Sequence, residues 1–206
     1  MTNKKYHELI TPYRDAMSTL IERINLLDHY LYDQSVSEYQ SIHHIQSRIK
    51  SQESIEAKLK KMGQPLSKEA AMENLKDIAG IRVVCYFASD IYKLIDVLKR
   101  QSTFIVVKEK DYIKEPKENG YRSLHLILAV PLYYMDASEY FPVEIQFRSM
   151  TMDLWASMEH RICYKKDRDG VLKEEFLQYA EELAKMEENF LEDIQSVCEN
   201  PTIVLP

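Results

Sequence analysis

The chain of 206 residues is 45% hydrophobic and holds only four glycines, which suits one substantial core and argues against a long disordered segment. No apolar run approaches the roughly 18 residues of a membrane span, and three cysteines without CxxC spacing exclude a disulfide framework, so we expect a cytoplasmic protein with no membrane partner. The net charge of -6 is uneven, because residues 167–193 hold ten acidic and three basic residues whereas lysines elsewhere form clusters that suit a small polyphosphate.

The spacing of apolar residues predicts helices at both ends of the chain and an α/β region between them. Three helices are expected first, at residues 6–33, 52–62 and 67–76. Four strands follow, at residues 81–87, 103–108, 123–130 and 141–148, with a helix capped by Ser89 over residues 89–100. Two last helices are expected at residues 153–164 and 172–197. We therefore predict one domain over residues 1–206 of the α/β (α+β) class, with helices around a mixed sheet of about five strands paired in sequence order.

The run Val-Glu-Ile-Gln-Phe-Arg at residues 143–148 alternates apolar and polar side chains. Because successive side chains of a strand point to opposite faces, Glu144, Gln146 and Arg148 should share one face. A face of carboxylate, amide and guanidinium is typical of the floor of a polar site, although an antiparallel sheet can also expose an ordinary polar face.

A basic cluster lies earlier in the chain, at residues 48–58. Ser54 and Lys58 are one helical turn apart and share a face, and they follow Arg48 and Lys50 closely. Such a group suits phosphate oxygens, but a solvated charged face shows the same pattern.

Asp77 and Arg82 flank a β-rich run, and an arginine within a strand that is expected to be buried needs a partner. One interpretation is an internal salt bridge between the two residues, and the other is a ligand. Asp77 together with Glu144 would supply two carboxylates from different segments, which is enough to hold Mg²⁺ with phosphate oxygens and water.

A loop rich in lysine leads into the predicted strand at residues 123–130. It contains Lys110, Lys117 and Tyr121, and His125 follows on the strand. A single histidine in a strand is often a core residue, and a single tyrosine after glycine often only packs. The combination of tyrosine with several lysines favours a functional loop.

Four motifs in order carry a resemblance to a known family. They read R-I-K…S…K, D-I-A-G-I-R, K-D-Y-I…K-E-N-G-Y-R-S-L-H and E-I-Q-F-R…W-A-S-M-E-H. Together they resemble the synthetase domain of the RelA/SpoT homologue family, from about Arg48 to Tyr164, and the length resembles that of its stand-alone small alarmone synthetases. The resemblance implies a nucleotidyltransferase-like fold and the transfer of pyrophosphate from ATP to the ribose 3′-hydroxyl of GDP or GTP, giving AMP and ppGpp or pppGpp.

The same resemblance implies roles on the ATP side of a site. Arg48 and Arg82 would sandwich the adenine, because a planar guanidinium can stack on a ring. The ATP phosphates would contact Lys50, Ser54 and Lys58.

It also implies the catalytic groups and the cofactor. Asp77 and Glu144 would hold Mg²⁺, Glu144 would accept the proton of the 3′-hydroxyl, and Gln146 would position Glu144 or the ribose. Alignment and charge neutralisation are the main requirements of this chemistry, so no covalent nucleophile is expected.

On the acceptor side, the resemblance implies that Tyr121 stacks on the guanine. The acceptor nucleotide and the transferred group would be surrounded by Lys110, Lys117, Asn119 and His125. The loop at residues 108–111 reads Lys-Glu-Lys-Asp and does not indicate a preference between GDP and GTP.

Family members that also hydrolyse the alarmone carry a large domain before the synthetase. Only 47 residues precede Arg48 here and no His-Asp dipeptide occurs, so we expect synthesis without hydrolysis. The apolar stripes at 6–33 and 172–197 predict a homo-oligomer built through these end helices, unless both helices pack on their own domain. The resemblance to the small synthetases, which form tetramers, implies a tetramer. If Leu20 and Ile24 lie at the interface rather than on the core side, replacing them with Asp should lower the mass.

Three other functions fit the sequence less well. A catalytically silent regulator that binds a nucleotide or RNA would keep the pocket without needing both Asp77 and Glu144. A transferase of AMP would normally carry an Asp-x-Asp pair, which is absent. A helical scaffold would leave the polar face at residues 143–148 unexplained.

Overall fold

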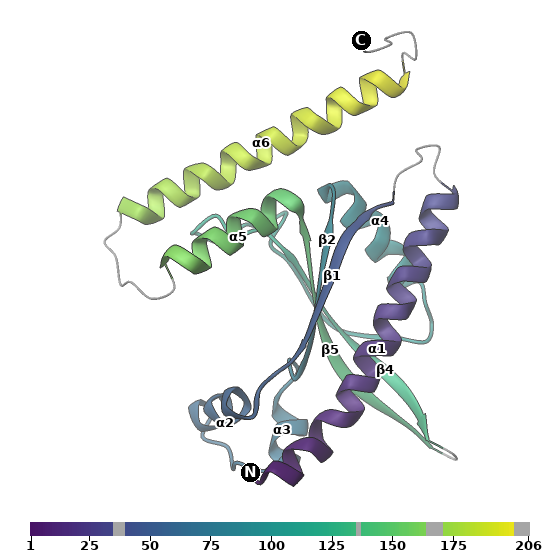
Figure 1. Ribbon diagram of the computed structural model, residues 1–206, viewed down its shortest axis with the longest axis vertical. Coiled ribbons are helices and arrows are strands. Elements are labelled where there is room, and N and C mark those ends of the chain that lie inside the picture. The colour runs from purple at the N-terminus through teal and green to yellow at the C-terminus, as the bar shows by residue number, and fades with distance from the viewer. Residues whose placement is uncertain (35–39, 135–136, 164–170, 200–206) are drawn as a thin grey trace.

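A five-stranded sheet flanked by helices forms the centre of the protein (Figure 1). The computed structural model describes residues 1–34, 40–134, 137–163 and 171–199. The elements are α1 (Asn3–Gln34), β1 (Ile42–Ile49), α2 (Gln52–Lys61), α3 (Lys68–Asn74), β2 (Ala79–Cys85), α4 (Ala88–Lys99), β3 (Ile105–Asp111), β4 (Leu124–Tyr134), β5 (Ala137–Ser149), α5 (Met150–Cys163) and α6 (Val171–Glu199). The mixed sheet with surrounding helices confirms the predicted fold class.

The strand order is β1-β2-β5-β4-β3, so the prediction that strands pair in sequence order is wrong for the centre of the sheet. β2 and β5 run parallel, and the other neighbours are antiparallel. A parallel pair needs a long crossover connection, and here that connection comprises α4, β3 and β4. As a result, β2 lies beside the strand that carries Glu144, with Gly80 opposite Glu144 and Arg82 opposite Gln146.

The strand β1 was not predicted, because residues 42–49 lack an apolar alternation. It is an edge strand in which none of the eight residues is fully buried. Its pairing with β2 places Arg48 opposite Gly80. The basic cluster at residues 48–58 therefore begins on an edge strand of the sheet, because Arg48 belongs to β1.

Serine side chains cap two of the helices. The Ser51 and Ser67 side chains accept hydrogen bonds from the amides of Ser54 and Ala70. The prediction that Ser89 caps a helix is wrong, because α4 begins at Ala88 after Phe87, which offers no capping side chain. The Ala88 amide instead donates to the carboxylate of Glu187 on α6.

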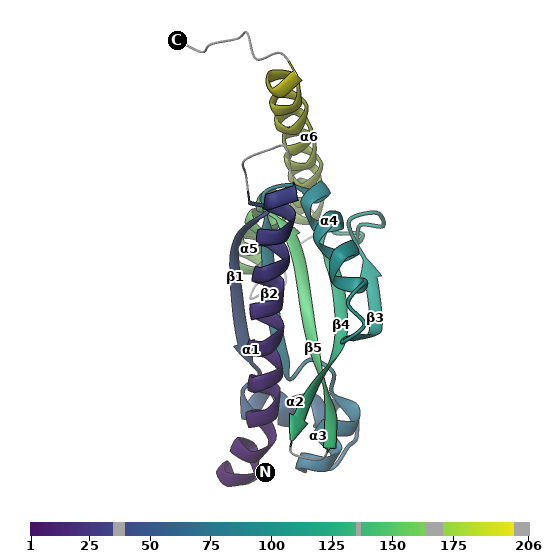
Figure 2. The same cartoon turned by 90° about the vertical axis from the view of Figure 1, so that its right-hand side faces the viewer.

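One face of the sheet is covered by α1 and α4, as the two views show (Figures 1 and 2). The apolar stripe of α1 packs into the core, and its members Leu20 and Ile24 are 0% exposed. The apolar side chains of β5 at 143, 145 and 147 are buried in the same core. Of the two positions left open for Leu20 and Ile24, the structure shows the core side and not an interface between subunits.

At one end of the sheet, α6 packs on α5 (Figure 1). A small second cluster joins them, made by Trp155 and Ala156 of α5 and by Phe176 and Ala180 of α6. The Trp155 indole also donates to the carbonyl oxygen of Phe176 at 2.7 Å. Within the described ranges, no helix combines the length and apolarity that a bilayer span requires.

Candidate active site

The polar face of the sheet lines a cavity of about 740 Å³. Its walls come from β1, α2, β2, β5 and the segment before β2. Seven predicted site residues line it: Arg48, Lys50, Ser54, Asp77, Arg82, Glu144 and Gln146. Sequence-distant motifs thus meet in one place because β2 lies between β1 and β5.

Asp77 is held by two lysines of the basic cluster. Lys50 Nζ and Lys58 Nζ donate to Asp77 Oδ2 at 2.6 and 2.8 Å. Burial raises the pKa of the Asp77 carboxyl, but these two hydrogen bonds and charges outweigh it and hold the pKa below its usual value. Asp77 therefore remains ionised, and an Asp77–Arg82 salt bridge is not formed.

The other carboxylate, Glu144, lies beside His125 of β4, with His125 Nδ1 3.5 Å from Glu144 Oε1. The hydrogen bond from His125 lowers the pKa of Glu144, burial and the charge of Asp77 raise it, and the net result is a lowered pKa. An ionised carboxylate thus persists on the floor of the cavity.

The two carboxylates fit a hard divalent cation. Asp77 Oδ1 is buried and has no hydrogen-bond partner among the described residues, so this oxygen is available to a ligand. No group of three or more metal-binding side chains occurs in the described part of the chain. A cation held by Asp77 and Glu144 would take its other oxygens from phosphate and water, which is how Mg²⁺ usually binds.

Tyr121 is the centre of the acceptor half of the predicted site. Its hydroxyl lies 2.8 Å from His125 Nε2 and accepts from Arg148 at 3.1 Å. Lys117 Nζ sits over the rings of Tyr121 and Tyr112, 4.6 and 4.7 Å from their centroids. The predicted Lys117, Tyr121 and His125 are therefore brought together.

Two predicted acceptor residues have local roles in this structure. Lys110 Nζ donates to the Tyr112 hydroxyl at 3.2 Å. The Asn119 side chain accepts from the Tyr121 amide at 3.2 Å and so shapes the turn before Tyr121. Lys110 thus contacts Tyr112, whose ring also lies under Lys117, and Asn119 stabilises the loop that carries Tyr121.

Arg148 and Asp153 carry contacts that the sequence did not assign. Arg148 is 6% exposed, and its guanidinium donates to Asp153 at 2.9 Å. The same Asp153 oxygen is 3.3 Å from Arg82. Burial lowers the pKa of Arg82, and the positive charges of Arg148 and Arg48 lower it further. The sequence did hold a signal for this pair, because Arg148 ends the alternating run at residues 143–148 and Asp153 follows five residues later.

The chain is similar in sequence to known proteins. Residues 47–169 match the family described as the region found in RelA/SpoT proteins. GTP pyrophosphokinase YwaC of Bacillus subtilis is 42% identical over 163 residues, which cover 76% of this chain and 74% of that protein. GTP pyrophosphokinase YjbM of the same organism is 36% identical over 80% of this chain and 76% of that protein.

A solved structure agrees over nearly the whole chain. The small alarmone synthetase 1 from Bacillus subtilis, bound to its product pppGpp, superposes with a TM-score of 0.81 at 31% identity, covering 95% of this chain and 99% of that chain. Sequence motifs, sheet topology and overall similarity therefore agree, and the chain belongs to the RelA/SpoT family, among its small alarmone synthetases.

Proposed function

We infer that the protein is a GTP pyrophosphokinase that transfers pyrophosphate from ATP to the 3′-hydroxyl of GTP or GDP. The products are AMP and pppGpp or ppGpp. The observation that carries this function is the pair of ionised carboxylates, Asp77 and Glu144, in one cavity rimmed by lysine and arginine. The relatives named GTP pyrophosphokinase support the same reaction.

The ATP half of the site is proposed to lie between β1, α2 and β2. Arg48 and Arg82 line the cavity from neighbouring strands, which suits two guanidinium groups on either side of an adenine ring. Lys50, Ser54 and Lys58 would bind the ATP phosphates. The two lysines now donate to Asp77, and on binding they would share their donors with phosphate oxygens.

Asp77 and Glu144 are proposed to hold Mg²⁺, using the free Oδ1 of Asp77. When bound, the ion would neutralise charge on the transferred group and align it with the acceptor. Glu144 would accept the proton of the 3′-hydroxyl, and the lowered pKa keeps it ionised for that role. Gln146, which lies opposite His125 on β4, would orient the ribose or Glu144.

Guanine is proposed to stack on Tyr121. The Lys117 ammonium now occupies one face of that ring. A guanine taking this place would release Lys117 toward the acceptor phosphates, where Lys110, Asn119 and His125 would also act. A planar base and an ammonium are both attracted to a tyrosine ring, so guanine can replace the Lys117 ammonium on the face of Tyr121.

We further propose a homotetramer that acts in the cytoplasm, where ATP and GTP are present. A catalytically silent protein that binds a nucleotide or RNA is the less favoured alternative. It gives no reason for two ionised carboxylates in one cavity, of which Asp77 keeps one oxygen without a partner among the described residues.

A product assay tests the proposal. The protein is mixed with ATP, GTP and Mg²⁺, and the nucleotides are separated. AMP together with a pentaphosphorylated guanosine is expected, whereas an adenylated product would indicate AMP transfer and no turnover would indicate a silent binder. Incubation with purified pppGpp should release no pyrophosphate above the buffer control, and steady release would contradict the expected absence of hydrolysis.

A further inference from the structure

Glu187, in the middle of α6, is a buried carboxylate that belongs to none of the motifs above. It is 7% exposed and lies beyond residues 47–169, the range that matches the family. Its Oε1 accepts from the Ala88 amide at 2.7 Å, and its Oε2 accepts from Ser149 Oγ at 2.5 Å and from Thr151 Oγ1. One side chain of α6 thus contacts the start of α4 and the junction of β5 with α5.

The surroundings of Glu187 explain why the charge is tolerated. No lysine, arginine or histidine forms an ion pair with it among the described residues. Three neutral donors satisfy it instead, and one of them is the first amide of α4, where the helix dipole favours a negative charge. A buried carboxylate with such partners loses much of its stabilisation when a donor is removed.

This junction leads directly to the acceptor half of the site. Ser149 follows Arg148, whose guanidinium donates to the Tyr121 hydroxyl at 3.1 Å. The position of β5 at Ser149 therefore sets where the Arg148 side chain meets Tyr121. A hydrogen bond from Ser149 to Glu187 fixes that position from α6.

A second contact connects α6 to the same loop. Gly120, directly before Tyr121, has a φ of 86°, and a Cβ built there would lie 2.8 Å from Ala180 Cβ. A cavity of about 220 Å³ remains between α6 and this loop, and Gly120, Arg122 and Glu187 are among its lining residues. Apolar packing is thus incomplete here, and the hydrogen bonds of Glu187 hold this part of α6 in addition to the bond between Trp155 and Phe176.

We propose that Glu187 is a positioning residue for the guanine-nucleotide half of the site, acting through Ser149 and Arg148 on Tyr121. The proposal rests on the pyrophosphokinase function inferred above. It assigns a role in acceptor binding to a helix that lies outside the matched family region.

The test compares Glu187→Gln with Glu181→Gln, an exposed position on the same helix. The amide keeps the size of the side chain but loses its charge and one acceptor. The KM for GTP should rise about tenfold in Glu187→Gln, while the KM for ATP changes less than about twofold. Glu181→Gln should match the wild type. Equal rises for both substrates, or a lowered Tm with unchanged KM values, would overturn the proposal.

Trp155, the single tryptophan, reports whether α6 stays in place, because its indole binds the Phe176 carbonyl. If its emission in Glu187→Gln is shifted to the red, Ser149→Ala provides the decisive variant, since it removes the donor through which Glu187 is proposed to act and leaves the Ala88 contact. It should raise the KM for GTP selectively, and its effect should not add to that of Glu187→Gln. Additive effects would contradict the proposal.

The inference and the function can fail separately. A wild-type protein without turnover would refute the function, and GTP affinity measured by calorimetry would then test Glu187. Weaker GTP binding in Glu187→Gln than in Glu181→Gln supports the positioning role, and equal affinities overturn it.

Discussion

At the scale of single residues, the charged groups of the site form ion pairs with each other before any substrate binds. Asp77 pairs with two lysines and Asp153 with Arg82 and Arg148, so each group keeps an excess of positive charge. Substrate phosphates and a cation would exchange with these partners rather than enter an empty space. Mutations here should therefore change binding and catalysis more than stability.

Glu144→Gln should abolish pyrophosphate transfer while leaving nucleotide binding measurable. The change keeps the size of the side chain but removes the negative charge next to His125 and the basic oxygen. Loss of general base help alone typically costs about 10²–10⁴ in rate. Single-turnover kinetics together with calorimetry check this. A variant that binds nucleotide and reacts at nearly the wild-type rate would show that Glu144 is not the base.

Tyr121→Ala and Tyr121→Phe separate the ring from the hydroxyl. The alanine variant loses the proposed stacking surface, which should weaken guanine-nucleotide binding by roughly 1–3 kcal/mol and leave the KM for ATP nearly unchanged. The phenylalanine variant keeps the ring but loses the contacts to His125 and Arg148, so its KM for GTP should rise less. The measurement is the KM for each substrate in both variants, and equal rises for ATP and GTP would argue against a guanine platform.

At the scale of elements, α1 is a core helix of this sheet. Leu20 is 0% exposed whereas Leu26, on the same helix, is 58% exposed. Leu20→Ala should lower the free energy of unfolding by about 2–5 kcal/mol, because it removes buried methyl groups and leaves a cavity. Leu26→Ala should stay within about 0.5 kcal/mol of the wild type. Urea unfolding compares the two, and similar values would mean that α1 is not packed as described.

The start of β1 is connected to α1 by Asp28. Its Oδ1 accepts from the amides of Ser41 and Ile42 at 3.0 and 3.3 Å, and the residue is 5% exposed. Burial raises the pKa of Asp28 and outweighs the lowering by these amides. The carboxyl thus binds its proton more tightly in the folded chain than in the unfolded chain. Its contribution to stability is fully present below the ordinary carboxyl range and is lost as the pH rises through the raised pKa.

Asp28→Asn keeps an acceptor oxygen without the charge, so its free energy of unfolding relative to the wild type should increase between about pH 4 and pH 7. Asp28→Ala loses the acceptor and should be less stable by about 1–3 kcal/mol. Urea unfolding at the two pH values measures both differences. Parallel pH profiles for wild type and Asp28→Asn would contradict the raised pKa.

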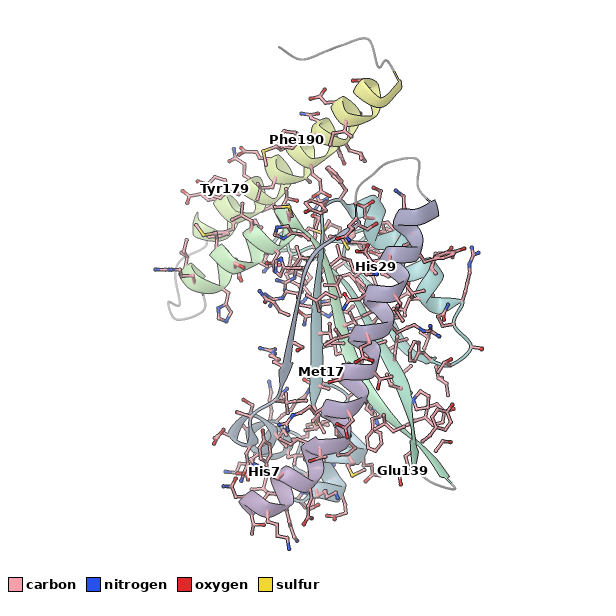
Figure 3. All side chains as sticks on the ribbon, turned by 45° about the vertical axis from the view of Figure 1, so that its right-hand side comes forward. His7, Met17, His29, Glu139, Tyr179 and Phe190 are labelled. Carbon is pink, nitrogen blue, oxygen red and sulfur yellow. The ribbon has the colours of Figure 1, made fainter. Side chains whose placement is uncertain are left out.

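At the scale of the whole molecule, part of the apolar surface that remains exposed lies on the two helices at one end of the sheet. Leu154 and Met158 of α5 are 53% and 48% exposed, and Tyr179 and Phe190 of α6, labelled in Figure 3, are 51% and 55% exposed. Uncovered apolar stripes of this kind are typical of interfaces. The proposed assembly should therefore involve α5 and α6 and not the buried stripe of α1.

Light scattering at micromolar concentration should give a mass of about four times 24.3 kDa. The double change Leu154→Asp and Phe190→Asp should lower that mass while the far-ultraviolet spectrum is retained. Tyr133→Asp, which alters the exposed β4–β5 hairpin, should leave the mass unchanged. A wild-type mass near 24.3 kDa would refute the oligomer.

Local spacing was enough to predict most elements and the faces of the central strand. The alternation at residues 143–148 predicted that Glu144 and Gln146 share a face, because a strand has a period of two regardless of its neighbours. The stripe of α1 and the serine caps at 51 and 67 follow from equally local rules. The family motifs also identified the residues that meet in the cavity, since their chemistry is present in the side chains themselves.

Partners across the fold were decided only by the tertiary structure. No local pattern indicates that Asp77 binds two lysines, that Asp153 joins two arginines, or that β2 pairs with β5. The strand β1 was missed because an edge strand needs no apolar alternation, and the stripe of α1 was assigned to an interface because periodicity does not say what covers it. Glu187 reaches Ala88 across 99 residues, and such a contact depends on the packing of α6, which sequence spacing does not encode.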